Sequence, residues 1–82
     1  MLFQLVQIEV MSDGRVAGAT PSEPLFELQE DAAAMAEFAA ARSGDDFGYD
    51  ADGDCWWASR GGHGMLLFIV RPLAASQIDA AA

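Results

Sequence analysis

Cys55 and His63 are the side chains of this sequence that could form a nucleophile and its general base. If residues 54–59 form a strand and 60–64 a loop, His63 lies in the loop and Cys55 lies about four residues back along the strand. At ~3.3 Å per residue their separation is about 13 Å, which is beyond hydrogen-bond reach. One cysteine and one histidine are also too few ligands for a structural zinc site. We therefore predict no catalytic residues, no cofactor and no enzyme activity.

Aspartates are concentrated in the stretch DDFGYDADGDCWWA, residues 45–58. Asp50, Asp52 and Asp54 match the first three ligand positions of a calcium-binding EF-hand loop. The match fails further on, because Cys55 stands where the loop needs a glycine and Gly61 where it needs a bidentate glutamate. We therefore expect calcium to bind weakly or not at all, and we predict no metal ligands in this stretch.

The net charge indicates which kinds of binding partner the protein can attract. Thirteen acidic residues are opposed by four arginines, with no lysine, for a net charge of −9. Nucleic acids and anionic membranes attract proteins that carry a dense basic surface, so we expect direct binding to neither. Long-range attraction instead favours basic proteins or cations. The alternative is that the acidity only keeps a small protein soluble.

The cysteine content and the hydropathy of the sequence indicate the cellular compartment. The single cysteine, Cys55, excludes an internal disulfide and fits a reducing cytoplasm. The first ten residues, MLFQLVQIEV, lack the basic segment and the cleavage site of a signal peptide. The longest apolar run, residues 65–70, is far shorter than the ~20 residues that span a bilayer. We expect a soluble, cytoplasmic protein.

Periodicity and turn residues predict the elements. Apolar alternation predicts a strand over 2–11, and Asp13-Gly14 favours a type I′ turn into a short strand over 15–20. Pro21 and Pro24 are then expected to end regular structure. Three further strands are expected over 47–51, 54–59 and 65–71, with Pro72 ending the last one.

A helix is expected over 28–42, between the two groups of strands. Its predicted core stripe consists of Leu28, Ala32, Met35, Phe38 and Ala39. The resulting order is β-β-α-β-β-β. We predict an α+β fold in which one amphipathic helix packs on one face of a small antiparallel sheet, forming a single domain over 1–73, with a flexible tail over 74–82.

The Asp52-Gly53 turn sets the register of the predicted hairpin, pairing Tyr49 with Trp56 and Asp50 with Cys55. Side chains alternate across a strand, so each face of the sheet carries its own apolar set. The face under the helix is expected to carry Phe47, Tyr49, Trp56, Leu66, Phe68 and Val70. The opposite face is expected to carry Cys55, Trp57, Leu67 and Ile69, bordered by Asp46 and Asp50. Either the first hairpin folds over this second face, or the face is an exposed apolar patch that could form a homodimer.

These observations favour a non-enzymatic binding or inhibitor protein that docks on a basic surface of a protein partner, such as a nucleic-acid-binding protein. Its aspartates would stand in for phosphates, and a tryptophan would anchor the complex. The expected partner-binding residues are Asp45, Asp46, Asp50, Asp52, Asp54, Trp56 and Trp57. In class and composition such a protein is similar to small acidic inhibitors of phage origin, including anti-CRISPR proteins. The alternatives are a small metal- or ligand-binding domain that uses residues 45–54, and a self-associating structural domain.

Overall fold

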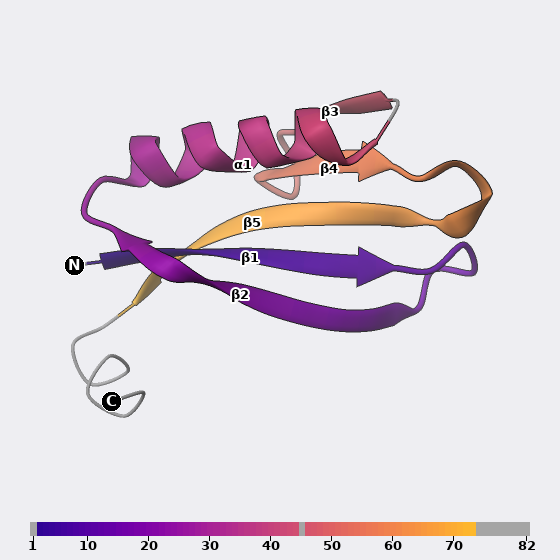
Figure 1. The fold of residues 1–82 in the computed structure, drawn as a ribbon, viewed down its shortest axis with the longest axis horizontal. Coiled ribbons are helices and arrows are strands. Elements are labelled where there is room, and N and C mark those ends of the chain that lie inside the picture. The colour runs from indigo at the N-terminus through magenta and orange to yellow at the C-terminus, as the bar shows by residue number, and fades with distance from the viewer. Residues whose placement is uncertain (1, 45, 74–82) are drawn as a thin grey trace.

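The computed structural model describes residues 2–44 and 46–73, which form one antiparallel sheet with a helix packed on it (Figure 1). The strand order across the sheet is β2-β1-β5-β4-β3. The elements are β1 (Leu2–Val10), β2 (Val16–Phe26), α1 (Gln29–Ser43), β3 (Asp46–Asp50), β4 (Cys55–Ser59) and β5 (Met65–Leu73), with a short 3₁₀ turn at Gly61–His63. The predicted α+β class and the β-β-α-β-β-β order are confirmed. The predicted tail, residues 74–82, lies outside the described residues.

Both predicted hairpin turns are present, but their backbone conformations differ from the predicted ones. In the first turn only Gly14 has a positive φ, of 90°, whereas a type I′ turn would need one at Asp13 as well. The Asp13 carboxylate instead accepts hydrogen bonds from the backbone N–H and the Nε of Arg15, at 3.0 and 2.6 Å. In the second turn the positive φ, of 49°, falls on Asp54 and not on Gly53.

β2 continues through Pro21 and Pro24, so the prediction that these prolines end regular structure is wrong. The strand pairs with β1 along one side only, and an edge strand tolerates proline because its outer side needs no N–H donor. Its ladder is irregular at this point: Val6 pairs with Pro21, but Gln4 pairs with Leu25, so the chain bulges between them. Pro72 likewise lies inside β5, beyond the part of that strand that pairs with β4.

The helix contacts the sheet through alanines. Of the predicted stripe, Ala32 is buried and Ala39 packs against the core, whereas Leu28, Met35 and Phe38 are exposed and their prediction as core is wrong. Ala32, Ala36 and Ala40 are fully or almost fully buried, whereas the side chains of Met35 and Phe38 are 44% and 55% exposed. These alanines recur every four residues and therefore share one face of the helix. Their small side chains let the helix backbone lie close to the strands, which turns the larger side chains of the helix outward.

The core lies between α1 and the middle of the sheet. Its buried residues are Leu5, Ala36, Ala40, Ala58, Leu66 and Phe68. The half-buried Trp56 and Val70 pack against this cluster, so the predicted core face is confirmed for β4 and β5. It is wrong for β3, where Phe47 and Tyr49 are 41% and 49% exposed. β3 is the outermost strand on this side, and the helix packs over the strands next to it.

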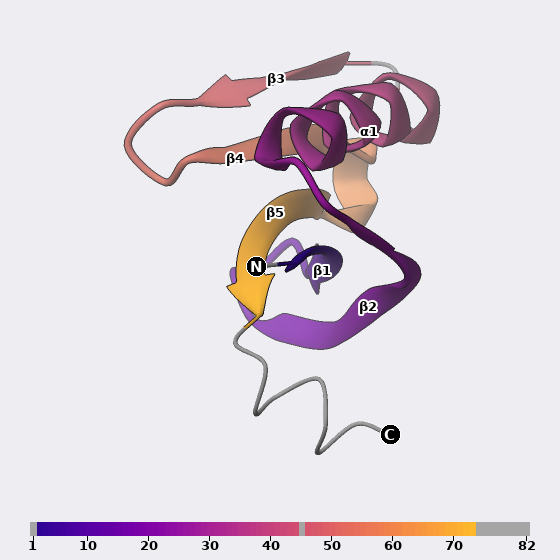
Figure 2. The same ribbon diagram turned by 90° about the vertical axis from the view of Figure 1, so that its left-hand side faces the viewer.

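The opposite face of the sheet is partly buried. The first hairpin does not fold over this face, because β1 joins the sheet beside β5. Seen from the end, the sheet curls so that β5 and β2 curve around β1 (Figure 2). Val6 and Cys55 are buried on this face. The side chains of the predicted dimer face are half-buried: Trp57, Leu67 and Ile69.

Candidate functional site

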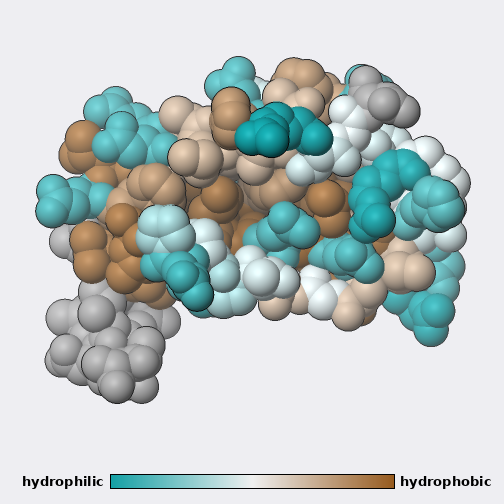
Figure 3. Space-filling model, viewed as in Figure 1, coloured by the Kyte–Doolittle hydropathy of each residue, from teal (hydrophilic) through white to brown (hydrophobic). Residues whose placement is uncertain are grey.

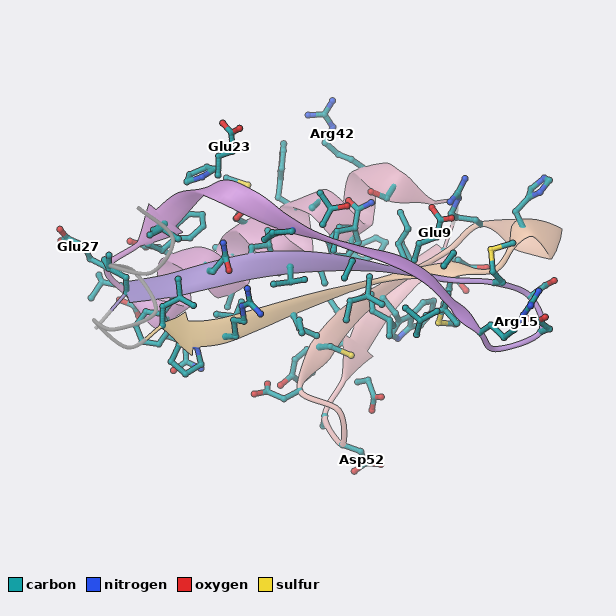
Figure 4. All side chains as sticks on the ribbon, turned by 90° about the horizontal axis from the view of Figure 1, so that it is seen from below. Glu9, Arg15, Glu23, Glu27, Arg42 and Asp52 are labelled. Atoms are coloured by element: carbon teal, nitrogen blue, oxygen red, sulfur yellow. The ribbon has the colours of Figure 1, made fainter. Side chains whose placement is uncertain are left out.

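The β3–β4 hairpin carries the acidic stretch and both tryptophans. Its predicted register is confirmed from Asp46 opposite Ser59 to Asp50 opposite Cys55. Figure 4 shows the hairpin extending away from the rest of the sheet, with Asp52 at its tip. The glycine at the helix end allows this arrangement, because a Cβ on Gly44 would overlap the backbone oxygen of Ser59. The hairpin is therefore a projecting arm whose base is fixed against the helix.

The two tryptophans point to opposite faces and have different surroundings. Trp56 packs against the core, and its ring centroid lies 5.3 Å from that of Tyr49, with the ring planes tilted by 55°. Trp57 lies across Gly48 on the other face, where a Cβ on that glycine would come within 2.8 Å of the indole Cζ2. Trp56 thus packs against the core on the helix side of the sheet, whereas Trp57 lies on the opposite side over Gly48.

A shallow groove of about 360 Å³ runs beside Trp57. It is lined by Tyr49, Asp50, Trp57, Met65 and Leu67. One carboxylate therefore borders an otherwise apolar and aromatic surface. A groove of this composition suits a side chain with an apolar stem and a cationic head, such as lysine or arginine.

The aspartates of the hairpin are exposed. Asp50 accepts a hydrogen bond from the backbone N–H of Asp52 at 3.1 Å, which stabilises the turn. Asp54 accepts one from the Tyr49 hydroxyl. This hydrogen bond, together with desolvation and the nearby carboxylates, raises the pKa of Tyr49 above its ordinary value. Asp46 is also exposed, and Asp45 lies outside the described residues.

The arginines lie elsewhere on the molecule. Figure 4 shows Arg15 and Arg42 well away from the hairpin tip. Each of the four contacts another group: Arg15 with Asp13 at 2.6 Å, Arg60 with Glu9 at 3.2 Å, Arg71 with Gln4 at 2.6 and 3.0 Å, and Arg42 above the Phe38 ring at 5.3 Å. Among the described residues, then, no basic side chain forms an ion pair with an aspartate of the hairpin. The negative charge of the hairpin is uncompensated within the part of the chain that the structure describes.

Cys55 and His63 lie at opposite ends of β4. Cys55 is the first residue of the strand and is 7% exposed, while His63 is exposed in the 3₁₀ turn beyond the last residue. Burial raises the pKa of the Cys55 thiol, and the carboxylates of Asp50 and Asp54 raise it further. A thiol that resists ionisation is a poor nucleophile. This cysteine packs as a small apolar side chain.

Within residues 2–44 and 46–73, no three histidine, cysteine, aspartate or glutamate side chains come close enough together to hold a metal ion. The aspartates of the hairpin do not converge on a common point. The described helix is also neither long nor apolar enough to cross a membrane.

An apolar surface that the sequence reasoning missed lies on the outer side of α1. Its exposed large side chains are Leu28, Met35 and Phe38. Figure 3 shows apolar atoms continuing from the helix into the opening above β2. The helical periodicity predicts all three as core residues, and their exposure contradicts that prediction. The spacing of Ala32, Ala36 and Ala40 was the signal that could have placed them outside.

The comparisons with known proteins give no identification. The chain matches no protein-family model, no curated protein and no solved structure.

Proposed function

We propose that this protein is a non-enzymatic binding protein that docks on a basic surface of a protein partner through the β3–β4 hairpin. The observation that carries the proposal is the uncompensated charge of this arm. Asp46, Asp50, Asp52 and Asp54 are exposed, while the arginines contact other parts of the chain. In a protein whose acids served only solubility, we would expect arginines to be interspersed among them.

The partner class follows from the arrangement of these charges. Asp46 and Asp50 lie on one face of β3, about 13 Å apart at ~3.3 Å per residue. A row of carboxylates on an extended backbone resembles the phosphates of a nucleic-acid strand in charge and in its linear form. Nucleic-acid-binding proteins have the dense Lys/Arg surfaces that such a row fits. Inhibition by occupation of a nucleic-acid site is the activity that we propose.

The physical effect should appear mainly in the rate of association. Exposed charges steer a partner over a distance comparable to the Debye length, about 8 Å at physiological ionic strength. Each exposed ion pair adds only about 0–1 kcal/mol to affinity. The apolar anchor, Trp57 with its groove, should instead govern dissociation.

The test is to capture partners from a nuclease-treated bacterial lysate on the immobilised protein and to measure association with each purified candidate. We expect association to slow as salt rises and to slow at least tenfold in the triple variant Asp46→Asn/Asp50→Asn/Asp54→Asn. We also expect nucleic acid to compete with this protein for the partner.

The matched control removes the same amount of charge elsewhere. Glu23, Glu30 and Glu37 are exposed and lie outside the hairpin, so their joint replacement by glutamine tests net charge alone. Equal slowing in both triple variants would mean that net charge acts without a defined site, and the proposal would fail. Association that is indifferent to nucleic acid would overturn the proposed class of partner.

A further inference from the structure

The sheet has two edges, and they differ in how well they are protected. β2 forms one edge and contains Pro21, Pro24 and a bulge, which are devices that prevent a further strand from pairing. β3 forms the other edge and has none of them. Its register with β4 is continuous over all five residues, Asp46–Asp50. Within the described chain, the outer side of β3 faces no strand, so its backbone donors and acceptors there are free to pair.

Charge opposes a second copy of this chain at that edge. An antiparallel pair of two β3 strands centred on Gly48 would place Asp46 of each copy opposite Asp50 of the other. Directly opposed like charges destabilise a strand pair, and each whole chain carries a net charge of −9. The same two aspartates would instead attract basic side chains at the opposing positions. The charges at this edge therefore favour pairing with a basic strand and disfavour pairing with β3 of a second copy.

We propose that β3 accepts an extended basic segment of the partner as an additional antiparallel strand. This inference rests on the function proposed above and specifies how the partner docks. The alternation of side chains defines the segment. Residues opposite Asp46 and Asp50 are lysine or arginine, and the residues between them that face Phe47 and Tyr49 are apolar, because both aromatic rings are partly exposed.

The central position of the segment lies opposite Gly48. There the indole of Trp57 covers the glycine, on the same face as the two aspartates. A cation at this position would lie near an aromatic ring between two carboxylates. Arginine is the side chain that best combines stacking on an indole with hydrogen bonding to carboxylates. The preferred segment therefore alternates basic and apolar residues, with arginine at its centre.

The experiment uses a synthetic peptide of sequence TKVRVKT with blocked ends and two kinds of control peptide. The scrambled peptide TKRKVVT has the same composition and charge but lacks the alternation. Two further versions of TKVRVKT carry N-methyl groups either on the valine amides or on the lysine and arginine amides. In an antiparallel pair, alternate amides of the added strand point toward β3, so only one of the two methylation patterns removes its hydrogen bonds.

Binding is measured by calorimetry at low salt and located by amide NMR shifts of the full chain. We expect TKVRVKT to bind at least tenfold more tightly than TKRKVVT and to shift the amides of residues 46–50. One methylated version should lose binding and the other should keep it. The variant Asp46→Asn/Asp50→Asn should bind TKVRVKT about threefold to tenfold more weakly, and the control Glu30→Gln/Glu37→Gln should differ by less than threefold.

The outcomes separate the docking mode from the function. If both methylated versions bind as well as the parent peptide, or if the scrambled peptide binds equally, strand addition is overturned while electrostatic docking stands. If TKVRVKT does not bind at millimolar concentration, strand addition is also overturned. The proposed function is decided independently, by the salt dependence and the charge variants of the purified partner.

Discussion

Replacing Ala36 with leucine should destabilise the protein by about 1–3 kcal/mol, because overpacking a filled core forces the surrounding side chains out of their preferred rotamers. Ala36 is 1% exposed and belongs to the core cluster with Leu66 and Phe68. A chain of 82 residues has a total stability of about 4–12 kcal/mol at ~0.05–0.15 kcal/mol per residue. The loss should lower the melting temperature by roughly 4–24 °C, at about 4–8 °C per kcal/mol.

The matched control is Ala34→Leu, the same substitution at an exposed position of the helix. It should change stability by no more than about 0.5 kcal/mol. Urea unfolding followed by circular dichroism measures both variants, because the difference in midpoint reports the difference in the free energy of unfolding when the slopes agree.

The complementary variant is Phe38→Ala, at the centre of the stripe that periodicity assigned to the core. If Phe38 were buried there, truncation would cost about 3–5 kcal/mol. Phe38 is 55% exposed, so truncation removes a little under half of the ~1.5–3 kcal/mol that full burial of the side chain would contribute to stability. The higher helix propensity of alanine offsets part of this loss. We expect a loss of about 1 kcal/mol or less. A loss above about 3 kcal/mol, with Ala36→Leu neutral, would show that the helix does not bury its alanine face.

Two further predictions concern the hairpin. Gly48→Ala should destabilise the protein and alter its tryptophan fluorescence, because the new Cβ would lie 2.8 Å from the Trp57 ring. Gly18→Ala, in a strand position with nothing within 4 Å of the new Cβ, should be neutral or stabilising, and equal effects in urea unfolding would contradict the packing of Trp57 on Gly48. Cys55 should react with a thiol reagent much more slowly in the folded than in the urea-unfolded protein at pH 7–9. Burial raises the pKa of the Cys55 thiol, so the folded state disfavours the thiolate. The protein should therefore lose stability as the pH rises above the pKa of the thiol in the unfolded chain. Rapid reaction of the folded protein would show that this side chain is accessible.

Local pattern was enough to predict the hairpin that carries the candidate site. Asp52-Gly53 set the register, and the pairs Tyr49–Trp56 and Asp50–Cys55 are present as expected. Register of this kind depends on turn position and alternation, which are both local properties. The positive φ at Asp54 shows the limit of such reasoning, because a glycine close by did not take the strained position.

Burial could not be predicted in the same way. The helix has two candidate stripes, and hydrophobicity favoured the one with Met35 and Phe38. The alanine face is buried instead, because close approach to the sheet depends on the size of side chains on both layers. Likewise, Pro21 disrupts a central strand but not an edge strand, and which strand lies at the edge is a property of the whole sheet.

The sequence by itself determined the class of fold, the order of the elements, the register of the hairpin and the excess of negative charge, since composition, periodicity and turn residues act over short stretches of chain. Only the tertiary structure decided that, among the described residues, no arginine forms an ion pair with an aspartate of the hairpin. Arg60 reaches Glu9 and Arg71 reaches Gln4 across separations of 51 and 67 residues, because β1 lies beside β5 in the sheet. Strand order, which no local pattern encodes, places these two arginines beside β1 and places the acidic strand β3 at the edge of the described sheet.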